Sequence, residues 1–209
     1  MSQDLTIGIS FFGAGNIGTT VISEIDRLRV DSFGLSDVSI EIRHILVRSL
    51  DRAAREAQGF VISEGQITTD VEEILSDPQT HIVVELMGGE DPAGEYIRRA
   101  LEAGKHVITA NKAVIAASGA SLFEIANRND LHLQFEASVG GGIPIISSLR
   151  RDLVANNISS IEAIINGTTN FILSKMSTGD DYESALAEAG RLGYAEPDPS
   201  ADVDGHDAV

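Results

Sequence analysis

Three glycines near the start of the chain have the spacing of a phosphate-binding loop. The motif follows an apolar, β-branched run over residues 5–12 and opens into a helical pattern; it reads Gly13-Ala14-Gly15-Asn16-Ile17-Gly18. In such a loop the first glycine permits a tight turn, the second lets the backbone approach a pyrophosphate, and the third lets the helix pack on the strand. The helix N-terminus then faces the anion. This order of strand, glycines and helix predicts dinucleotide binding, although tight turns without a nucleotide use the same residues.

A basic residue at the end of the second expected strand bears on which dinucleotide binds. That strand covers residues 38–47 and is followed by Arg48 and Ser49, while Asp51 is displaced from the strand end. NAD-selective sites place an acidic residue there for the ribose 2′-hydroxyl, whereas a guanidinium suits a 2′-phosphate. We therefore expect NADP(H) to be preferred over NAD(H). The alternative is that Arg48 is a solvated arginine at a strand end.

Alternating strand and helix patterns surround these residues. Further strands are expected over residues 81–86, 105–109 and 131–137, with helices between them. Met87 and Gly88 follow the first of these strands, where a glycine-rich turn can let the backbone pass close to a cofactor. A plain turn would use the same residues. The regular alternation predicts an α/β fold with a Rossmann-like, doubly wound parallel sheet.

The pattern changes near Ser138, where a glycine run is closed by Pro144. We expect a domain boundary there, with a dinucleotide-binding domain over residues 1–137 and a second part over residues 138–209. Within the second part, residues 145–155, 171–176 and 181–193 have helical patterns, and residues 159–165 have the composition of a strand.

Composition excludes several classes of function. The chain has 32 acidic and 15 basic residues, a formal net charge of −17, and no cysteine. Such a surface repels nucleic acid and anionic membranes, so neither is an expected partner. The absence of cysteine removes disulfides, thiolate metal sites and thiol nucleophiles. No run is long and apolar enough to span a bilayer, and residues 1–6 lack the features of a signal peptide, so we expect a cytoplasmic protein.

Five segments together resemble the homoserine dehydrogenase family along nearly the whole chain. They are GAGNIG at 13–18, AGKHVITANKAVIA at 103–116, FEASVGGGIPIISSLR at 135–150, INGTTNFILSKM at 165–176 and GYAEPDPSADVDGHDA at 193–208. The glycine loop alone is shared by many families, but the other four segments in this order are specific.

The resemblance implies an NAD(P)-dependent oxidoreductase of threonine and methionine biosynthesis. This family interconverts L-homoserine and L-aspartate-4-semialdehyde by hydride transfer, and no covalent intermediate is needed, in agreement with the missing cysteine. A different NADP-dependent dehydrogenase would explain the first half of the chain but not the segment at 193–199. A dinucleotide-binding module without catalytic activity is the alternative from another class.

The resemblance also assigns residues. Catalytic roles fall on Lys112, between nicotinamide and substrate, and on Asp207, next to the reacting centre. Glu196 and Asp202 match the substrate-binding carboxylates, of which Glu196 would hold the substrate ammonium group. Without the resemblance, a solvated lysine and hydrated acids would be the simpler interpretation. The residues expected to contact the cofactor are Gly13, Gly15, Asn16, Ile17, Gly18, Arg48, Met87, Gly88, Lys112 and Gly193.

A monovalent cation site is implied as well. Glu136, Val139, Gly141 and Ile143 would supply oxygens, mostly backbone carbonyls, to a structural Na⁺, because a hard cation prefers oxygen ligands. A hinge between domains is the alternative interpretation, and both can be true.

In the family, a second lysine follows the position of Asp207 by one helical turn, which would place it beyond Val209. We therefore expect this chain alone to bind NADP(H) weakly and to turn over negligibly. The resemblance also implies that residues 138–209 are an incomplete α+β domain that would bind substrate and form a dimer interface. We therefore expect a homo-oligomer, a dimer or tetramer, with a small-molecule substrate.

Overall fold

The computed structural model describes residues 5–28, 38–50, 65–195 and 198–206. These residues form two compact units, Met1–Asp152 and Leu153–Val209. The division lies later in the chain than the glycine run at which the sequence pattern changes. Among the described residues, no helix has both the length and the apolar character needed to cross a membrane.

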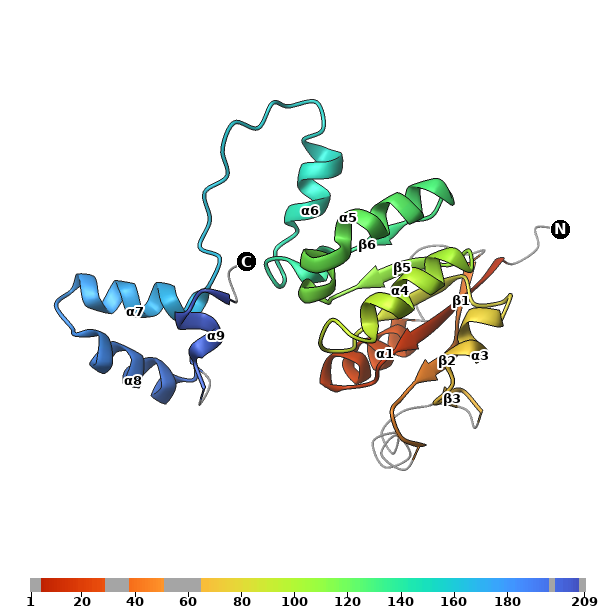
Figure 1. Cartoon of the computed structure of the whole chain (residues 1–209), viewed down its shortest axis with the longest axis horizontal. Helices are drawn as coiled ribbons and strands as arrows, with labels where there is room; N and C mark the ends of the chain where they lie inside the picture. Colours follow the sequence, from red (N-terminus) through yellow and green to blue (C-terminus); the bar gives the residue numbers. More distant parts are fainter. Residues whose placement is uncertain (1–4, 29–37, 51–64, 196–197, 207–209) are drawn as a thin grey trace. The chain divides into compact units, whose positions relative to one another are not determined.

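The first unit is built on a six-stranded sheet in the order β3-β2-β1-β4-β5-β6 (Figure 1). Each neighbouring pair of strands is parallel. The strands are β1 (Leu5–Phe12), β2 (Val38–Leu46), β3 (Ile67–Thr68), β4 (Ile82–Glu85), β5 (His106–Thr109) and β6 (Leu133–Gln134). This is the strand order of a Rossmann-type sheet, so the predicted fold class is confirmed.

Helices connect the strands and cover both faces of the sheet. They are α1 (Asn16–Leu28), α3 (Val71–Ser76), α4 (Ala93–Glu102) and α5 (Lys112–Arg128). Two begin with a side-chain cap: the Asp70 carboxylate accepts from the Glu72 amide, and the Asn111 side chain accepts from the Val114 amide. Such caps satisfy amides that have no partner inside the helix.

Successive side chains of β1 point to opposite faces of the sheet, as the two-residue period of a strand requires. Phe12 is buried in one cluster with residues of α3, α4 and α5, whereas Phe11 is buried in a second cluster with Ile22 of α1. Helices α4 and α5 pack against each other over the first of these faces (Figure 1). The apolar strand residues therefore form a core on each side, and the sheet is covered on both.

The chain after β5 differs from its sequence pattern. Alternation predicts a strand over residues 131–137, but β6 contains only Leu133 and Gln134, and a 3₁₀ helix follows over Glu136–Ser138. The helix expected over residues 145–155 is present as a short turn, α6 (Ile145–Ser147), continued by a π-helical stretch over Ser148–Asp152.

The second unit, described by itself, consists of α7 (Gly167–Ser177), α8 (Tyr182–Leu192) and α9 (Ser200–Val203). Ile172, Ala185 and Ala189 form its small buried core. Asp181 caps the start of α8, and Gly193, at φ 79°, ends it in the left-handed conformation that favours glycine. The described part of this unit contains helices and extended chain only.

The strand predicted over residues 159–165 is wrong for this structure. The segment has no strand partner among the described residues, and Ile161, Ile164 and Ile165 are 63%, 73% and 69% exposed. A strand is stabilised by pairing and by burial of one face, and this segment has neither here.

Candidate functional site

A cleft of about 530 Å³ opens at the carboxyl ends of β1, β2 and β4. In an open parallel sheet, ligands bind outside the carboxyl ends of the strands, where the chain connections diverge to opposite sides. The cleft is lined by Gly13, Ala14, Gly15, Leu46, Val47, Arg48, Ser49, Thr69, Met87, Gly88, Asp91, Pro92 and Tyr96. The first unit thus brings five of the expected cofactor residues, Gly13, Gly15, Arg48, Met87 and Gly88, into one cavity.

The three glycines of the loop have different environments. Gly13 has φ +99°, and a Cβ there would lie 3.0 Å from the Leu86 carbonyl oxygen. A Cβ on Gly18 would lie 2.7 Å from the Gly13 carbonyl oxygen, too close for an undistorted backbone. A Cβ on Gly15 would meet nothing within 4 Å, so the space above Gly15 is open to a ligand.

Helix α1 begins directly behind this loop, with Asn16 and Ile17 as its first residues. Its first turn has no acidic residue, and Ile17 is 63% exposed. The first amides of a helix have no partner inside it and carry the positive end of the helix dipole. The loop therefore presents free donors and a positive potential, which together suit a phosphate group.

Arg48 and Ser49 lie where β2 ends, and both line the cleft. The strand end is fixed by backbone hydrogen bonds, since the Val47 amide donates to the Thr68 carbonyl of β3 at 2.8 Å. An arginine at this position adds a cation to a chain with a net charge of −17. It offers bidentate donors to an anionic group in the cleft.

The loop after β4 forms the opposite wall with Met87 and Gly88. The Met87 amide donates to the Glu85 carboxylate at 2.7 Å, and the Asn111 side-chain amide donates to the Gly89 carbonyl at 2.6 Å. These bonds hold the loop against the end of β5.

Thr69, Asp91, Pro92 and Tyr96 are among the lining residues to which the sequence analysis assigned no role. Tyr96 lies on α4, and its ring packs edge-on against Phe12 with 5.6 Å between ring centroids. In the sequence, Tyr96 is an ordinary residue of an amphipathic helix, and no motif marks it. It lies beside the cleft because of the way in which α4 packs.

Lys112 is the exposed first residue of α5, directly after the capping residue Asn111. A cation at the N-terminus of a helix is opposed by the helix dipole. Local conflicts of this kind concentrate at functional sites, because stability alone gives no reason to keep them.

The residues expected to hold a cation lie in the 3₁₀ helix and turn after β6. Both carboxylate oxygens of Glu136 accept backbone hydrogen bonds, from the amides of Ile146 at 2.8 Å and Ser147 at 2.7 Å. Among the described residues, no backbone amide donates to the carbonyls of Val139 and Gly141. Two carbonyl oxygens of the expected ligand set are therefore available, in a turn that Gly140 and Gly141 make with φ 69° and 60°.

The remaining expected residues belong to the second unit. Gly193 ends α8, and the Asp202 carboxylate in α9 accepts a hydrogen bond from the Asn166 side-chain amide at 2.7 Å. Glu196 and Asp207 lie outside the described residues.

Fold, glycine loop and cleft define the first unit as a Rossmann-type dinucleotide-binding domain. The family model for the NAD-binding domain of homoserine dehydrogenase matches residues 13–136, and the model for homoserine dehydrogenase matches residues 144–209. The chain therefore belongs to the homoserine dehydrogenase family.

Similar proteins agree with this assignment. Homoserine dehydrogenase of Synechocystis sp. is 46% identical over 208 residues, with 98% of this chain and 46% of the relative covered. The one from Mycobacterium leprae is 42% identical, with 100% and 46% covered. The chain spans about half the length of these curated relatives.

Solved structures show the same relationship. A homoserine dehydrogenase from Thiobacillus denitrificans superposes with a TM-score of 0.82 at 41% identity, over 97% of this chain and 46% of that one. A hyperthermophilic archaeal homoserine dehydrogenase in complex with NADPH gives a TM-score of 0.79 at 31% identity, over 98% and 66% of the two chains.

Proposed function

We propose that this chain forms the dinucleotide-binding part, and the beginning of the substrate-binding part, of an NADP(H)-dependent homoserine dehydrogenase. The reaction interconverts L-homoserine and L-aspartate-4-semialdehyde in the biosynthesis of threonine and methionine. The observation that carries the proposal is the cleft in which the glycine loop and Arg48 line one cavity, in a chain of this family.

The glycine loop would bind the pyrophosphate. Gly13, Gly15 and Gly18 allow the close approach of backbone, and the amides at Asn16 and Ile17 lie at the positive end of α1. Met87 and Gly88 would contact the nucleotide from the opposite wall, and by resemblance to the family Gly193 would also be a cofactor-binding residue.

The preference for NADP(H) is attributed to Arg48, with Ser49 as a second donor. Both line the cleft at the end of β2, where a 2′-phosphate reaches in Rossmann-type sites. The archaeal relative in complex with NADPH supports, by analogy, the binding of this dinucleotide.

Catalysis would use Lys112 and Asp207, with Glu196 and Asp202 binding the substrate. A bound nicotinamide supplies or accepts the hydride. Lys112, as a cation at the start of α5, would orient the substrate oxygen and hold a proton there, while the carboxylate of Glu196 would pair with the substrate ammonium group.

A structural Na⁺ would be held by oxygens of Glu136, Val139, Gly141 and Ile143. The carbonyls of Val139 and Gly141, which receive no backbone amide among the described residues, fit a hard cation that prefers oxygen. The Glu136 carboxylate already accepts the amides of Ile146 and Ser147, and its backbone carbonyl accepts the Val139 amide at 3.2 Å, so a Glu136 oxygen would bind the cation in addition to a hydrogen bond. The homo-oligomer and the cytoplasmic location stay predictions.

The proposal is tested by measuring NADPH oxidation with L-aspartate-4-semialdehyde, in the 209-residue chain and in a chain extended to the length of its relatives. Binding of NADPH to both chains is measured in parallel by fluorescence. We expect both chains to bind NADPH and only the extended chain to turn over. If both bind NADPH and neither turns over, the chain is a dinucleotide-binding module without this activity.

A further inference from the structure

Glu85 is a carboxyl group in the interior of the first unit. It is the last residue of β4 and is 0% exposed, and none of the roles proposed above uses it. A carboxyl group in such a place is costly unless its oxygens are hydrogen-bonded. Its partners therefore indicate what it does.

The partners of Glu85 come from two neighbouring segments of the cofactor site. One oxygen, Oε1, accepts from the Met87 amide at 2.7 Å, and the other, Oε2, accepts from the Thr109 hydroxyl at 2.5 Å. The Thr109 hydroxyl also accepts from the Asn111 amide at 2.9 Å. A single carboxyl group thus connects the wall of the cleft with the end of β5.

Asn111 completes the connection to the helix that carries Lys112. Its side-chain oxygen accepts from the Val114 amide at 3.2 Å, which caps α5, and its side-chain nitrogen donates to the Gly89 carbonyl at 2.6 Å. The same nitrogen lies 3.5 Å from Glu85 Oε1. Asn111 is 7% exposed and Thr109 is 0% exposed, so these bonds are shielded from bulk solvent.

Every group that faces the Glu85 oxygens acts as a donor. Amide N–H groups can only donate, and the Thr109 hydroxyl directs its hydrogen to Oε2. Burial raises the pKa of the Glu85 carboxyl above its usual value, and the hydrogen bonds from Thr109, Met87 and Asn111, which lower the pKa, offset burial only in part. The arrangement therefore matches a group that accepts on both oxygens.

We propose that Glu85 is a positioning residue of the dinucleotide site. It acts through Thr109 and Asn111 to fix the position of the Met87–Gly89 loop relative to the start of α5. The inference rests on the proposed function. It assigns no contact with cofactor to Glu85 itself. Its consequence is that the cleft wall and Lys112 are placed by one hydrogen-bonded unit.

The chain offers a matched pair of buried threonines for the test. Thr109 is at the carboxyl end of β5, on the side of the cleft, whereas Thr80 precedes the amino end of the neighbouring strand β4. Thr80 is 2% exposed, and its hydroxyl bonds to Ser10 at 2.8 Å and to the Asp77 carboxylate at 3.2 Å. Replacement of either threonine by valine removes a buried hydroxyl that is bonded to a carboxylate.

The experiment measures NADPH affinity by fluorescence and the melting temperature of each variant of the 209-residue chain. Thr109→Val should raise the Kd for NADPH about tenfold, and Thr109→Ser should restore it to within about twofold of the unmodified chain. Thr80→Val should lower the melting temperature by a few degrees, as Thr109→Val should, but leave the Kd for NADPH within about twofold of the unmodified chain. Glu85→Gln, which keeps the shape of the side chain but replaces an acceptor by a donor, should weaken NADPH about fivefold or more.

The outcomes separate the inference from the proposed function. If the unmodified chain binds NADPH and neither Thr109→Val nor Glu85→Gln changes the Kd, the inference is wrong and the function stands. Equal losses for Thr109→Val and Thr80→Val would show a general effect of destabilisation and would also overturn it. Failure of the unmodified chain to bind NADPH would overturn the proposed function, and the inference with it. If Thr109→Val does not fold, the Kd of Glu85→Gln decides.

Discussion

Gly18, in the first turn of α1, is packed against the backbone of Gly13 in the loop that precedes this helix. A Cβ at residue 18 would lie 2.7 Å from the Gly13 carbonyl oxygen, a separation that real Cβ atoms do not show. The helix and the glycine loop can therefore keep this approach only while residue 18 has no side chain.

Gly18→Ala should displace the loop, because the obstructing atom belongs to the backbone and not to a flexible side chain. We expect a loss of about 1–3 kcal/mol in the free energy of unfolding and at least a tenfold weaker NADPH affinity. Chemical denaturation and fluorescence titration measure the two effects. Gly190→Ala, in α8 with no atom within 4 Å of the added Cβ, is the control and should not lower stability. An unchanged unfolding free energy in Gly18→Ala would contradict the prediction.

Gly15→Ala should separate binding from stability. The added methyl group meets no protein atom within 4 Å, so the unfolding free energy should stay within about 0.5 kcal/mol of the unmodified chain. The same methyl group would occupy space that the pyrophosphate needs, and NADPH affinity should fall at least tenfold. Binding that survives Gly15→Ala would mean that the dinucleotide does not lie on this loop.

Arg48→Asp should weaken NADPH far more than NADH. The change removes a guanidinium from the cleft and adds a charge that repels a 2′-phosphate. We expect a loss of about 10–100-fold for NADPH, in line with hydrogen bonds to a charged group, and a small change for NADH. Arg128→Asp, at the exposed end of α5, makes the same change in net charge away from the cleft and is the matched control. Equal losses for both dinucleotides would remove the assignment of Arg48 to the 2′-phosphate.

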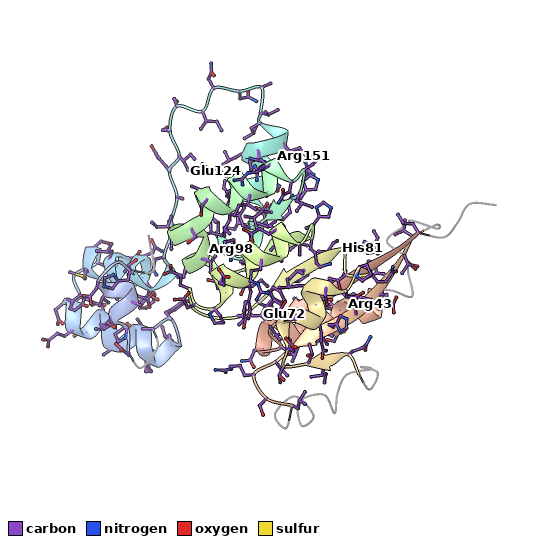
Figure 2. All side chains as sticks on the ribbon, turned by 45° about the vertical axis from the view of Figure 1, so that its right-hand side comes forward. Arg43, Glu72, His81, Arg98, Glu124 and Arg151 are labelled. Carbon is purple, nitrogen blue, oxygen red and sulfur yellow. The ribbon has the colours of Figure 1, made fainter. Side chains whose placement is uncertain are left out.

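Asp77 should make stability depend on pH in the acid range. Burial raises the pKa of this carboxyl, but hydrogen bonds from the Gln79 amide, Arg43 and His44 outweigh burial and lower the pKa from 3.8 to about 2. A lowered pKa in the folded state stabilises the fold above pH 3.8, and the contribution is lost as the pH falls from about 5 towards 2. Arg43, which forms an ion pair with Asp77, lies in the same region of the first unit as His81 (Figure 2).

The test compares the free energy of unfolding of the unmodified chain with that of Asp77→Asn, measured by urea unfolding at several pH values. The unmodified chain should be more stable by about 1–2 kcal/mol at pH 7, and the difference should shrink as the pH falls below about 4. Glu124→Gln, on the outer face of α5 (Figure 2), is the control and should show a smaller difference at neutral pH. A difference that stays constant between pH 7 and pH 2 would mean that the Asp77 charge does not contribute.

Lys112→Met should abolish catalysis more than binding. In the chain extended to the length of its relatives, we expect turnover of L-aspartate-4-semialdehyde to fall at least 100-fold, because general acid–base groups contribute at about that level. NADPH affinity should fall less than tenfold, since most of the lining of the cleft is unchanged. Lys112→Arg should not restore turnover, because a guanidinium keeps its proton and is larger. Lys175→Met, in α7, is the control, and turnover equal to that of the control would remove Lys112 from the reaction.

The fold of the first unit could be predicted because its signals are local. The apolar strand before Gly13, the helix after it and the repeated alternation that follows require no knowledge of distant contacts. The two-residue β3 leaves no such pattern, since Ile67 and Thr68 are a strand only through pairing with β2. The segment at 159–165 fails for the opposite reason: its β-branched residues favour a strand, but the described part of the second unit offers it no partner.

The site was predictable to the extent that a motif marks it. Glycines and a basic residue at a strand end are visible in sequence, and the structure places Gly13, Gly15 and Arg48 in one cleft. Tyr96 lines the cleft through the packing of α4. Glu85 and Thr109 meet because β4 and β5 are neighbours in the sheet, although 24 positions separate these two hydrogen-bonded residues. No local pattern distinguishes such residues from ordinary core.

The order of the strands sets a sequence of events during synthesis of the protein. β1 is the first strand to be made, yet it lies between β2 and β4 and gains its second neighbour only after Glu85 has been translated. At about 5–20 residues per second the ribosome needs several seconds to cover that distance. Until β4 is made, Ile9, Phe11 and Phe12 belong to a segment without charges or proline that lacks this neighbour. The nascent chain is therefore most prone to aggregation before β4 emerges, and holding chaperones should act on it in that interval.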